Sequence, residues 1–219
     1  MSYFVSSLPE LLARIIVLFT AITVHEYAHG YVAYKLGDPT AKYSGRLSFN
    51  PMSHLDPIGA VCLALFGFGW AKPVPVNPMY FKDRKRDNAI VAVAGPLSNI
   101  LLAFASTVIT ALYFVFVLSR TSNFITSFIY TVLVQLAVVN IRFAVFNLIP
   151  FPPLDGSKIL GAFLSYESYS KLLQYEHLGF PILMLLSFTG FLGSLLSLFI
   201  TPLYSLWATF LTALVNLLS

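Results

Sequence analysis

Long apolar stretches constrain the fold of this chain more than any other feature. Four of them reach the roughly 20 residues that a helix needs to cross the hydrocarbon core of a bilayer. They cover Leu8–Leu36, Ala89–Leu118, Phe124–Ile149 and Leu178–Ile200. Only 10% of the residues are charged, whereas a soluble domain carries about 25% charged residues. The sequence therefore predicts an all-α polytopic membrane protein and excludes a soluble fold.

Two further apolar stretches are shorter than a full crossing. Pro57–Trp70 has 14 residues, so we expect a re-entrant or interfacial segment there, and a full crossing stays open. Leu203–Leu217 has 15 residues and follows Pro202, so whether it forms a fifth crossing also stays open. We expect one membrane-embedded domain over residues 1–219, with a three-span core at about 8–160 and one or two C-terminal spans at about 178–218.

The basic residues predict the orientation of these spans. Eight of the 13 lysines and arginines lie between Lys35 and Arg86, whereas Arg120 alone lies between the second and third spans. The positive-inside rule therefore places the 35–86 loop in the cytoplasm and the N-terminus outside. In such a chain the net charge of +4 is a topology signal, and we expect no nucleic-acid partner.

A metal-binding motif lies near the end of the first span. His25 and His29 are four residues apart, so on a helix both side chains lie on one face and can hold one metal ion. Glu26 follows the first histidine and can act as a general base on a metal-bound water. The motif indicates hydrolytic chemistry at membrane depth.

A catalytic zinc usually takes three protein ligands, so a third one is needed. The candidates are His54, Asp56, Asp155, Glu167, Glu176 and His177. Asp155 follows a proline-broken helix among apolar residues, where a carboxylate is costly unless a cation or donor meets it. The alternative is that Asp155 caps the following helix. For His54 and Asp56 we favour a role in a turn over a separate metal site.

Three motifs in order resemble the site-2 protease family of intramembrane zinc metalloproteases. The first is the pair His25 and His29 with Glu26, and the second is Gly95-Pro96-Leu97-Ser98-Asn99. The third runs from Asn147 through Pro150 and Pro152 to Leu154-Asp155-Gly156. The chain looks like the short prokaryotic branch of the family that lacks PDZ and CBS domains.

The resemblance implies roles for particular residues. His25, His29 and Asp155 would bind one Zn²⁺, Glu26 would be the catalytic base, and Asn147 would bind substrate or stabilise the oxyanion. Val74 and Val76 would pair with an extended substrate. For Gly95 and Asn99 the residue types themselves favour close helix packing over a direct catalytic role, and support of a metal ligand by Asn99 stays open. A small re-entrant β-hairpin would match part of Phe66–Pro78, between the first and second spans.

The resemblance also implies partners. Substrates would be transmembrane proteins, cleaved within or near their membrane-spanning segments in a prokaryotic cell membrane, as in regulated intramembrane proteolysis. Two other readings stay open: a membrane metal transporter that uses the same ligands, and an inactive homologue that binds membrane proteins without cleaving them. Substrate identity, activating signal and oligomeric state do not follow from the sequence.

Overall fold

Long helices dominate the computed structural model, which describes residues 8–59 and 70–218. Four stretches are long and apolar enough to cross a membrane. They are α1 (Leu8–Lys35), α4 (Arg84–Tyr113) with its π-helical continuation η3 (Phe114–Leu118), α5 (Phe124–Asn147) and α9 (Phe191–Leu218). The first three agree with the predicted spans, and the protein is a multi-pass membrane protein.

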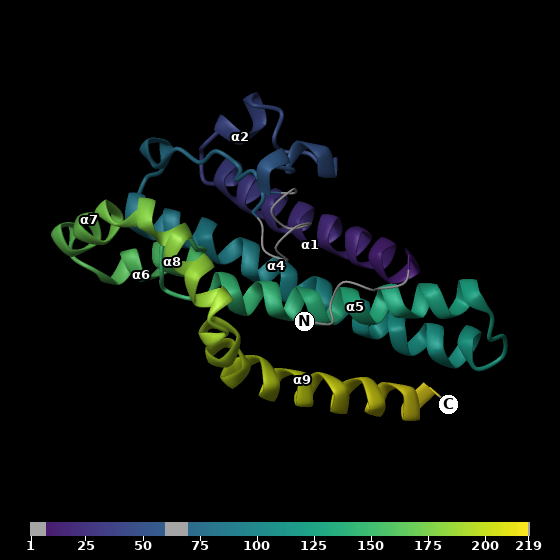
Figure 1. Ribbon diagram of the computed structural model, residues 1–219. Helices are drawn as coiled ribbons and strands as arrows, with labels where there is room; N and C mark the ends of the chain where they lie inside the picture. Colours follow the sequence, from purple (N-terminus) through teal and green to yellow (C-terminus); the bar gives the residue numbers. More distant parts are fainter. Residues whose placement is uncertain (1–7, 60–69, 219) are drawn as a thin grey trace.

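Shorter elements gather near one end of the long helices (Figure 1). After α5 the chain forms α6 (Asp155–Phe163), α7 (Tyr166–Gln174) and α8 (Glu176–Phe188). Between α1 and α4 it forms α2 (Thr40–Tyr43) and the 3₁₀ turns η1 (Pro51–Ser53) and η2 (Pro78–Tyr80). The start of α4, the end of α5 and the start of α6 therefore meet at this end, where the polar residues of the motifs lie.

Helix α4 is the centre of the bundle, because it packs against α1, α5, α6 and α9. Small side chains are prominent among the residues buried between these helices, as is usual where membrane helices approach closely. They include Ala13, Ala21, Ala92, Ala103, Ala137 and Ala144. Polar caps fix two helix starts: Asp83 accepts backbone hydrogen bonds at the start of α4, and Asn123 forms a capping box with Thr126 at the start of α5.

The C-terminal boundaries differ from the prediction. The predicted span Leu178–Ile200 is divided: α8 ends at Phe188 and α9 begins at Phe191. Gly190 lies between them with φ +76°, a left-handed conformation that glycine adopts without steric cost and that commonly ends helices. Pro202 lies inside α9, since membrane helices tolerate proline where neighbours satisfy the freed backbone. The described residues thus contain one C-terminal candidate span.

The predicted β-hairpin is not found in the described residues. Residues 70–77 are extended, but they form no strand, and the single bridge in this region joins Leu55 to Ala71. Pro73 and Pro75 lack the N–H groups that a ladder needs, which explains why the pairing does not continue. The predicted re-entrant segment 57–70 lies mostly outside the described residues, as does the part of the hairpin at 66–69.

Candidate metal centre and active site

Three side chains meet at one point between α1 and α6. The Nε2 atoms of His25 and His29 are 3.0 Å apart. Each of these atoms lies 3.1 Å from Oδ2 of Asp155. All three residues are buried, and they form the one group of potential metal ligands found among the described residues.

The opposite nitrogen of each imidazole fixes its tautomer. Nδ1 of His29 lies 2.7 Å from the carbonyl oxygen of Val91, which can only accept, so this nitrogen carries the proton. Nδ1 of His25 lies 2.6 Å from Oδ1 of Asn99 and is likewise the donor. In the neutral form of each ring the proton is thus on Nδ1, and the two Nε2 atoms present their lone pairs to one point, as they do in ligands of a metal.

A chain of buried amides sets the direction of the His25 contact. The Asn99 amide nitrogen donates to the carbonyl of Ala21 at 3.2 Å and to Oδ1 of Asn140 at 2.6 Å. Asn140 in turn donates to the carbonyl of Leu136 at 2.7 Å. Because both carbonyls accept only, each amide has one orientation, and the oxygen of Asn99 must face His25. Both asparagines are fully buried.

The arrangement fits zinc in ligand type, spacing and charge. Ligands 2.0–2.1 Å from a tetrahedral zinc lie about 3.3 Å from one another, close to the separations of 3.0 to 3.1 Å found here. Burial acts to raise the pKa of the Asp155 carboxyl, whereas the Lys158 ammonium, 3.5 Å from Oδ1, acts to lower it and favours the ionised carboxylate. A carboxylate and two nitrogen lone pairs then converge, which a cation stabilises.

Asp155 does not cap the helix that it begins. Leu154 occupies the N-cap position of α6, without a side-chain cap. Oδ2 of Asp155 faces the imidazoles, and Oδ1 lies 3.5 Å from Nζ of Lys158. The alternative reading of Asp155 as a capping residue is therefore wrong.

Gly95 lets α4 approach the imidazoles. A Cβ atom at this position would lie 2.4 Å from Nε2 of His29 and 2.6 Å from Cε1 of His25, far inside van der Waals contact. Asn99 follows one turn later on the same face of α4. The motif Gly95-Pro96-Leu97-Ser98-Asn99 thus serves the site in two ways. Gly95 leaves space for the two imidazoles, and Asn99 accepts the hydrogen bond from Nδ1 of His25.

Glu26 faces the extended segment 71–77. Its Oε2 accepts a hydrogen bond of 2.8 Å from the backbone N–H of Val74, and the carboxylate is buried. The segment is held at other points as well: the Lys72 N–H donates to the carbonyl of His54, the Arg46 guanidinium donates to the carbonyl of Lys72, and the Asn77 N–H donates to Asp38. These contacts fix the main chain beside Glu26.

A pocket of about 360 Å³ opens onto the three ligands. Its wall includes Glu26, Asn147 and Lys158, together with Val74 and Val76 of the extended segment. Asn147 donates to the carbonyl of Phe143 through its amide nitrogen at 2.9 Å, which leaves a second amide proton for a ligand. Tyr169 of α7 also lines the pocket, and burial raises the pKa of its phenol.

The remaining sequence candidates lie apart from the cluster. His54 is buried and contacts the carbonyl of Ser48, and Asp56 accepts from the N–H groups of Ile58 and Gly59. Glu167 pairs with Lys171 at 2.8 Å on the surface, and His177 is exposed. Glu176 lines the pocket without joining the ligand group. The turn role expected for Asp56 agrees with its contacts.

Two contributors to the site were missed in the sequence. Asn140 is an amide inside an apolar span, and this signal could have identified it, because a buried polar group in a membrane helix requires a partner. Val91 contributes only its carbonyl. No side-chain pattern could have identified that contact.

Known proteins resemble this chain over most of its length. The model of "Peptidase family M50" matches residues 114–190. A Bacillus subtilis protein named "Putative zinc metalloprotease YwhC" is 39% identical over 209 residues, which cover 94% of this chain and 87% of that protein. The Rip2 protein of Mycolicibacterium smegmatis, with the same descriptive name, is 27% identical, covering 77% of this chain and 64% of its own length. No solved structure matches the chain significantly.

Proposed function

Because the chain belongs to peptidase family M50, whose members include the site-2 proteases, we propose that this zinc metalloprotease cleaves peptide bonds within or near transmembrane segments of membrane proteins. The cluster of His25, His29 and Asp155 beside Glu26, in a pocket between membrane helices, is the observation that carries the proposal. One domain over residues 1–219 would contain the whole site.

The three converging ligands would hold the zinc ion. Bound zinc supplies Lewis acidity, which activates water and polarises a carbonyl group. Asn99 keeps the metal-facing nitrogen of His25 unprotonated, and the Val91 carbonyl does the same for His29. Lys158, near Oδ1 of Asp155, favours the ionised carboxylate.

Glu26 would be the general base. The Val74 N–H holds one of its two oxygens, so the other is available to take a proton from the attacking water and return it to the leaving amine. The second amide proton of Asn147 would stabilise the negative charge that develops on the carbonyl oxygen. Both side chains line one pocket, which supports their action on one peptide bond.

Substrate would enter this pocket as an extended chain. A helix hides its peptide groups, so the scissile segment must unwind before it can be attacked. Val74 and Val76 would contact the unwound segment, since both line the pocket. We further propose that the 35–86 loop and the metal cluster lie toward the cytoplasm, with the N-terminus outside, in accordance with the basic residues of that loop.

Replacement of Glu26 by Gln tests the proposal. The purified full chain, wild type or Glu26→Gln, is given a panel of single-span membrane peptides, and its zinc content is measured in parallel. We expect the variant to keep one zinc per chain and to lose cleavage by at least the hundredfold typical of general-base removal. Glu10→Gln, at the other end of α1, is the matched control and should cleave as the wild type does.

Cleavage by Glu26→Gln at the wild-type rate would refute the mechanism. Zinc flux into liposomes that contain the protein, without cleavage of any peptide in the panel, would favour the transporter reading. Zinc retention without cleavage or flux in the wild type would favour the inactive homologue.

A further inference from the structure

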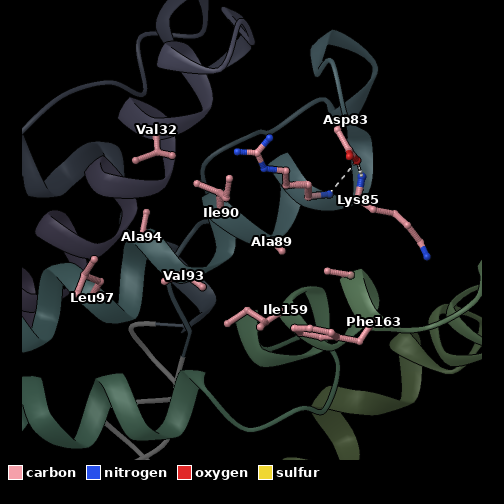
Figure 2. A pocket seen from close by; sticks show the side chains of 12 residues that line it. Val32, Asp83, Lys85, Ala89, Ile90, Val93, Ala94, Leu97, Ile159 and Phe163 are labelled. Atoms are coloured by element: carbon pink, nitrogen blue, oxygen red, sulfur yellow. Dashed lines mark hydrogen bonds between the residues drawn. The ribbon is translucent and has the colours of Figure 1, made fainter.

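A second hollow lies on the opposite side of α4 from the metal cluster. Its volume is about 640 Å³, and its walls come from α1, the first half of α4, and α6. Figure 2 shows Ile90, Val93 and Leu97 of α4 on one side and Ile159 and Phe163 of α6 facing them. Apart from Asp83, Lys85 and Arg86, which lie at the start of α4, every residue that lines the groove is apolar.

The length of the groove corresponds to one leaflet of a membrane. Lys85 and Leu97, its outermost members on α4, are 12 positions apart, which is about 18 Å along a helix. Half the hydrocarbon core of a bilayer is about 15 Å thick. The exposed aromatic rings of Phe163 and Tyr166 lie at the same end as Lys85, since Lys85 donates to the carbonyl of Leu164 and stacks over Tyr166. Such rings favour the interface.

The polar end of the groove is strongly basic. Lys85 and Arg86 line this end of the groove, and Lys82 and Arg84 are next to them in the sequence, which gives four cations within five residues. The two acids nearby bind backbone groups instead, as Asp83 accepts from the N–H groups of Lys85 and Arg86 and Asp87 accepts from the N–H of Asp83. Among the described residues no ion pair joins these four cations to a carboxylate. Their charge is available to an anion.

The contact between α4 and α6 separates this groove from the catalytic pocket. Asn88, Val91 and Ala92 of α4 line the catalytic pocket, whereas Ala89, Ile90 and Val93 line the groove. On α6, Ser157 and Lys158 face the catalytic pocket, and Ile159 and Phe163 face the groove. A substrate helix in the groove could not present a peptide bond to the metal ligands unless these two helices separated.

From these observations we infer that the groove binds one anionic phospholipid, with its phosphate at the basic start of α4 and an acyl chain along Ile90, Val93 and Ile159. The apolar walls match an acyl tail and the groove length matches one leaflet. The cations, which form no ion pair with a carboxylate of the described residues, match a negatively charged headgroup. This lipid site is independent of the proposed cleavage reaction.

Native mass spectrometry of the full-length protein in detergent tests the inference. The probes are dioleoyl phosphatidylglycerol, which is anionic, and dioleoyl phosphatidylcholine, which has the same tails and no net charge. We expect one phosphatidylglycerol to bind with clear preference. The double variant Arg84→Gln/Arg86→Gln should weaken that binding by about twenty-five-fold, since each cation near a lipid surface contributes roughly fivefold.

Two other variants separate the site from general lipid adhesion. Arg120→Gln removes a cation at the far end of the α4 span and should leave the preference for phosphatidylglycerol over phosphatidylcholine unchanged. Ala94→Leu fills the apolar part of the groove and should weaken binding while the headgroup cations remain. Zinc content, measured for every variant, shows that the bundle is folded.

Equal binding of the two lipids by the wild type would overturn the inference, as would an equal loss in Arg120→Gln. Displacement of the lipid by glycerol 3-phosphate at similar concentration would show that the apolar groove contributes nothing, and would also overturn it. Displacement by a transmembrane peptide, one chain for one lipid, would assign the groove to substrate instead.

Discussion

Helices α1 and α9 are alike in length and hydropathy but differ in what they bury. Each has 28 residues, and their most apolar windows have mean hydropathies of 1.6 and 1.7. In α1, 28% of that window is buried inside the protein, whereas in α9 none of it is. Hydropathy therefore identifies both as membrane helices without showing which one belongs to the core.

The difference comes from polar partners. Thr23, His25, Glu26 and His29 of α1 are buried, and the last three contact α4, α6 or the 71–77 segment. Helix α9 packs against α4, α5 and α8. Its contacts include hydrogen bonds from Trp207 to Thr107 at 2.7 Å and from Tyr204 to the carbonyl of Val138 at 3.2 Å, and neither of these reaches the metal cluster. Substitution of the residues that contact His25 or His29 should therefore lower the zinc affinity, whereas substitutions in α9 should lower only the stability of the fold.

The largest expected effect follows from Asp155→Ala, which removes one of three ligands. Loss of a residue that only hydrogen-bonds to a metal ligand lowers metal affinity by up to about a hundredfold. Because Asp155 is itself a proposed ligand, its loss should lower the zinc affinity by more than that. Zinc per chain after dialysis against a weak chelator measures the loss. Asp56→Ala removes a carboxylate that binds backbone N–H groups and should keep its zinc. Full zinc content in Asp155→Ala would exclude Asp155 as a ligand.

A methyl group at Gly95 should have the next largest effect. Gly95→Ala would place Cβ 2.4 Å from Nε2 of His29, so the imidazole or α4 must move, and we expect zinc affinity to fall by about ten- to hundredfold. Gly193→Ala in α9 is the matched control, because nothing lies within 4 Å of its new methyl group. If both variants bound zinc as the wild type does, the approach of α4 would not constrain the ligands.

The amide chain behind His25 should give a graded response. Asn99→Ala removes the acceptor for Nδ1 of His25, and zinc affinity should fall by about tenfold or more. Asn140→Ala should cost less, since Asn99 keeps its contact with the Ala21 carbonyl. Competition with a zinc dye gives both affinities, and Ser106→Ala, whose hydroxyl binds only its own helix, provides the reference. A larger loss in Asn140→Ala than in Asn99→Ala would contradict this order.

The smallest effect is expected in α9. Trp207→Phe removes the hydrogen bond to Thr107 and should lower stability by about 1 kcal/mol, seen as a lower Tm in detergent. Zinc affinity should stay at the wild-type value, because no ligand or ligand partner moves. A loss of zinc affinity in Trp207→Phe would show that α9 supports the site, and the contrast with α1 would fail.

The sequence predicted the elements whose signals are local. Three spans, the histidine pair and the candidacy of Asp155 follow from helix length, four-residue spacing and the cost of a buried carboxylate. The break at Gly190 was missed, because Pro202 looked like the stronger helix breaker although a proline can remain inside a membrane helix. Among the described residues of the expected hairpin no strand forms, because Pro73 and Pro75 lack the N–H groups that pairing needs, whereas the prediction took an extended segment to be a paired strand. Asn140 and the Val91 carbonyl act through contacts between helices, which spacing along one helix does not reveal.

The hydrogen bond from Val74 to Glu26 has a consequence for mutagenesis. Its donor is a main-chain nitrogen, which every residue except proline provides. Alanine at position 74 would report only the loss of the valine side chain from the pocket wall, and it would leave this hydrogen bond in place. The informative change is Val74→Pro, which deletes a single proton donor from a chain that already contains proline on either side.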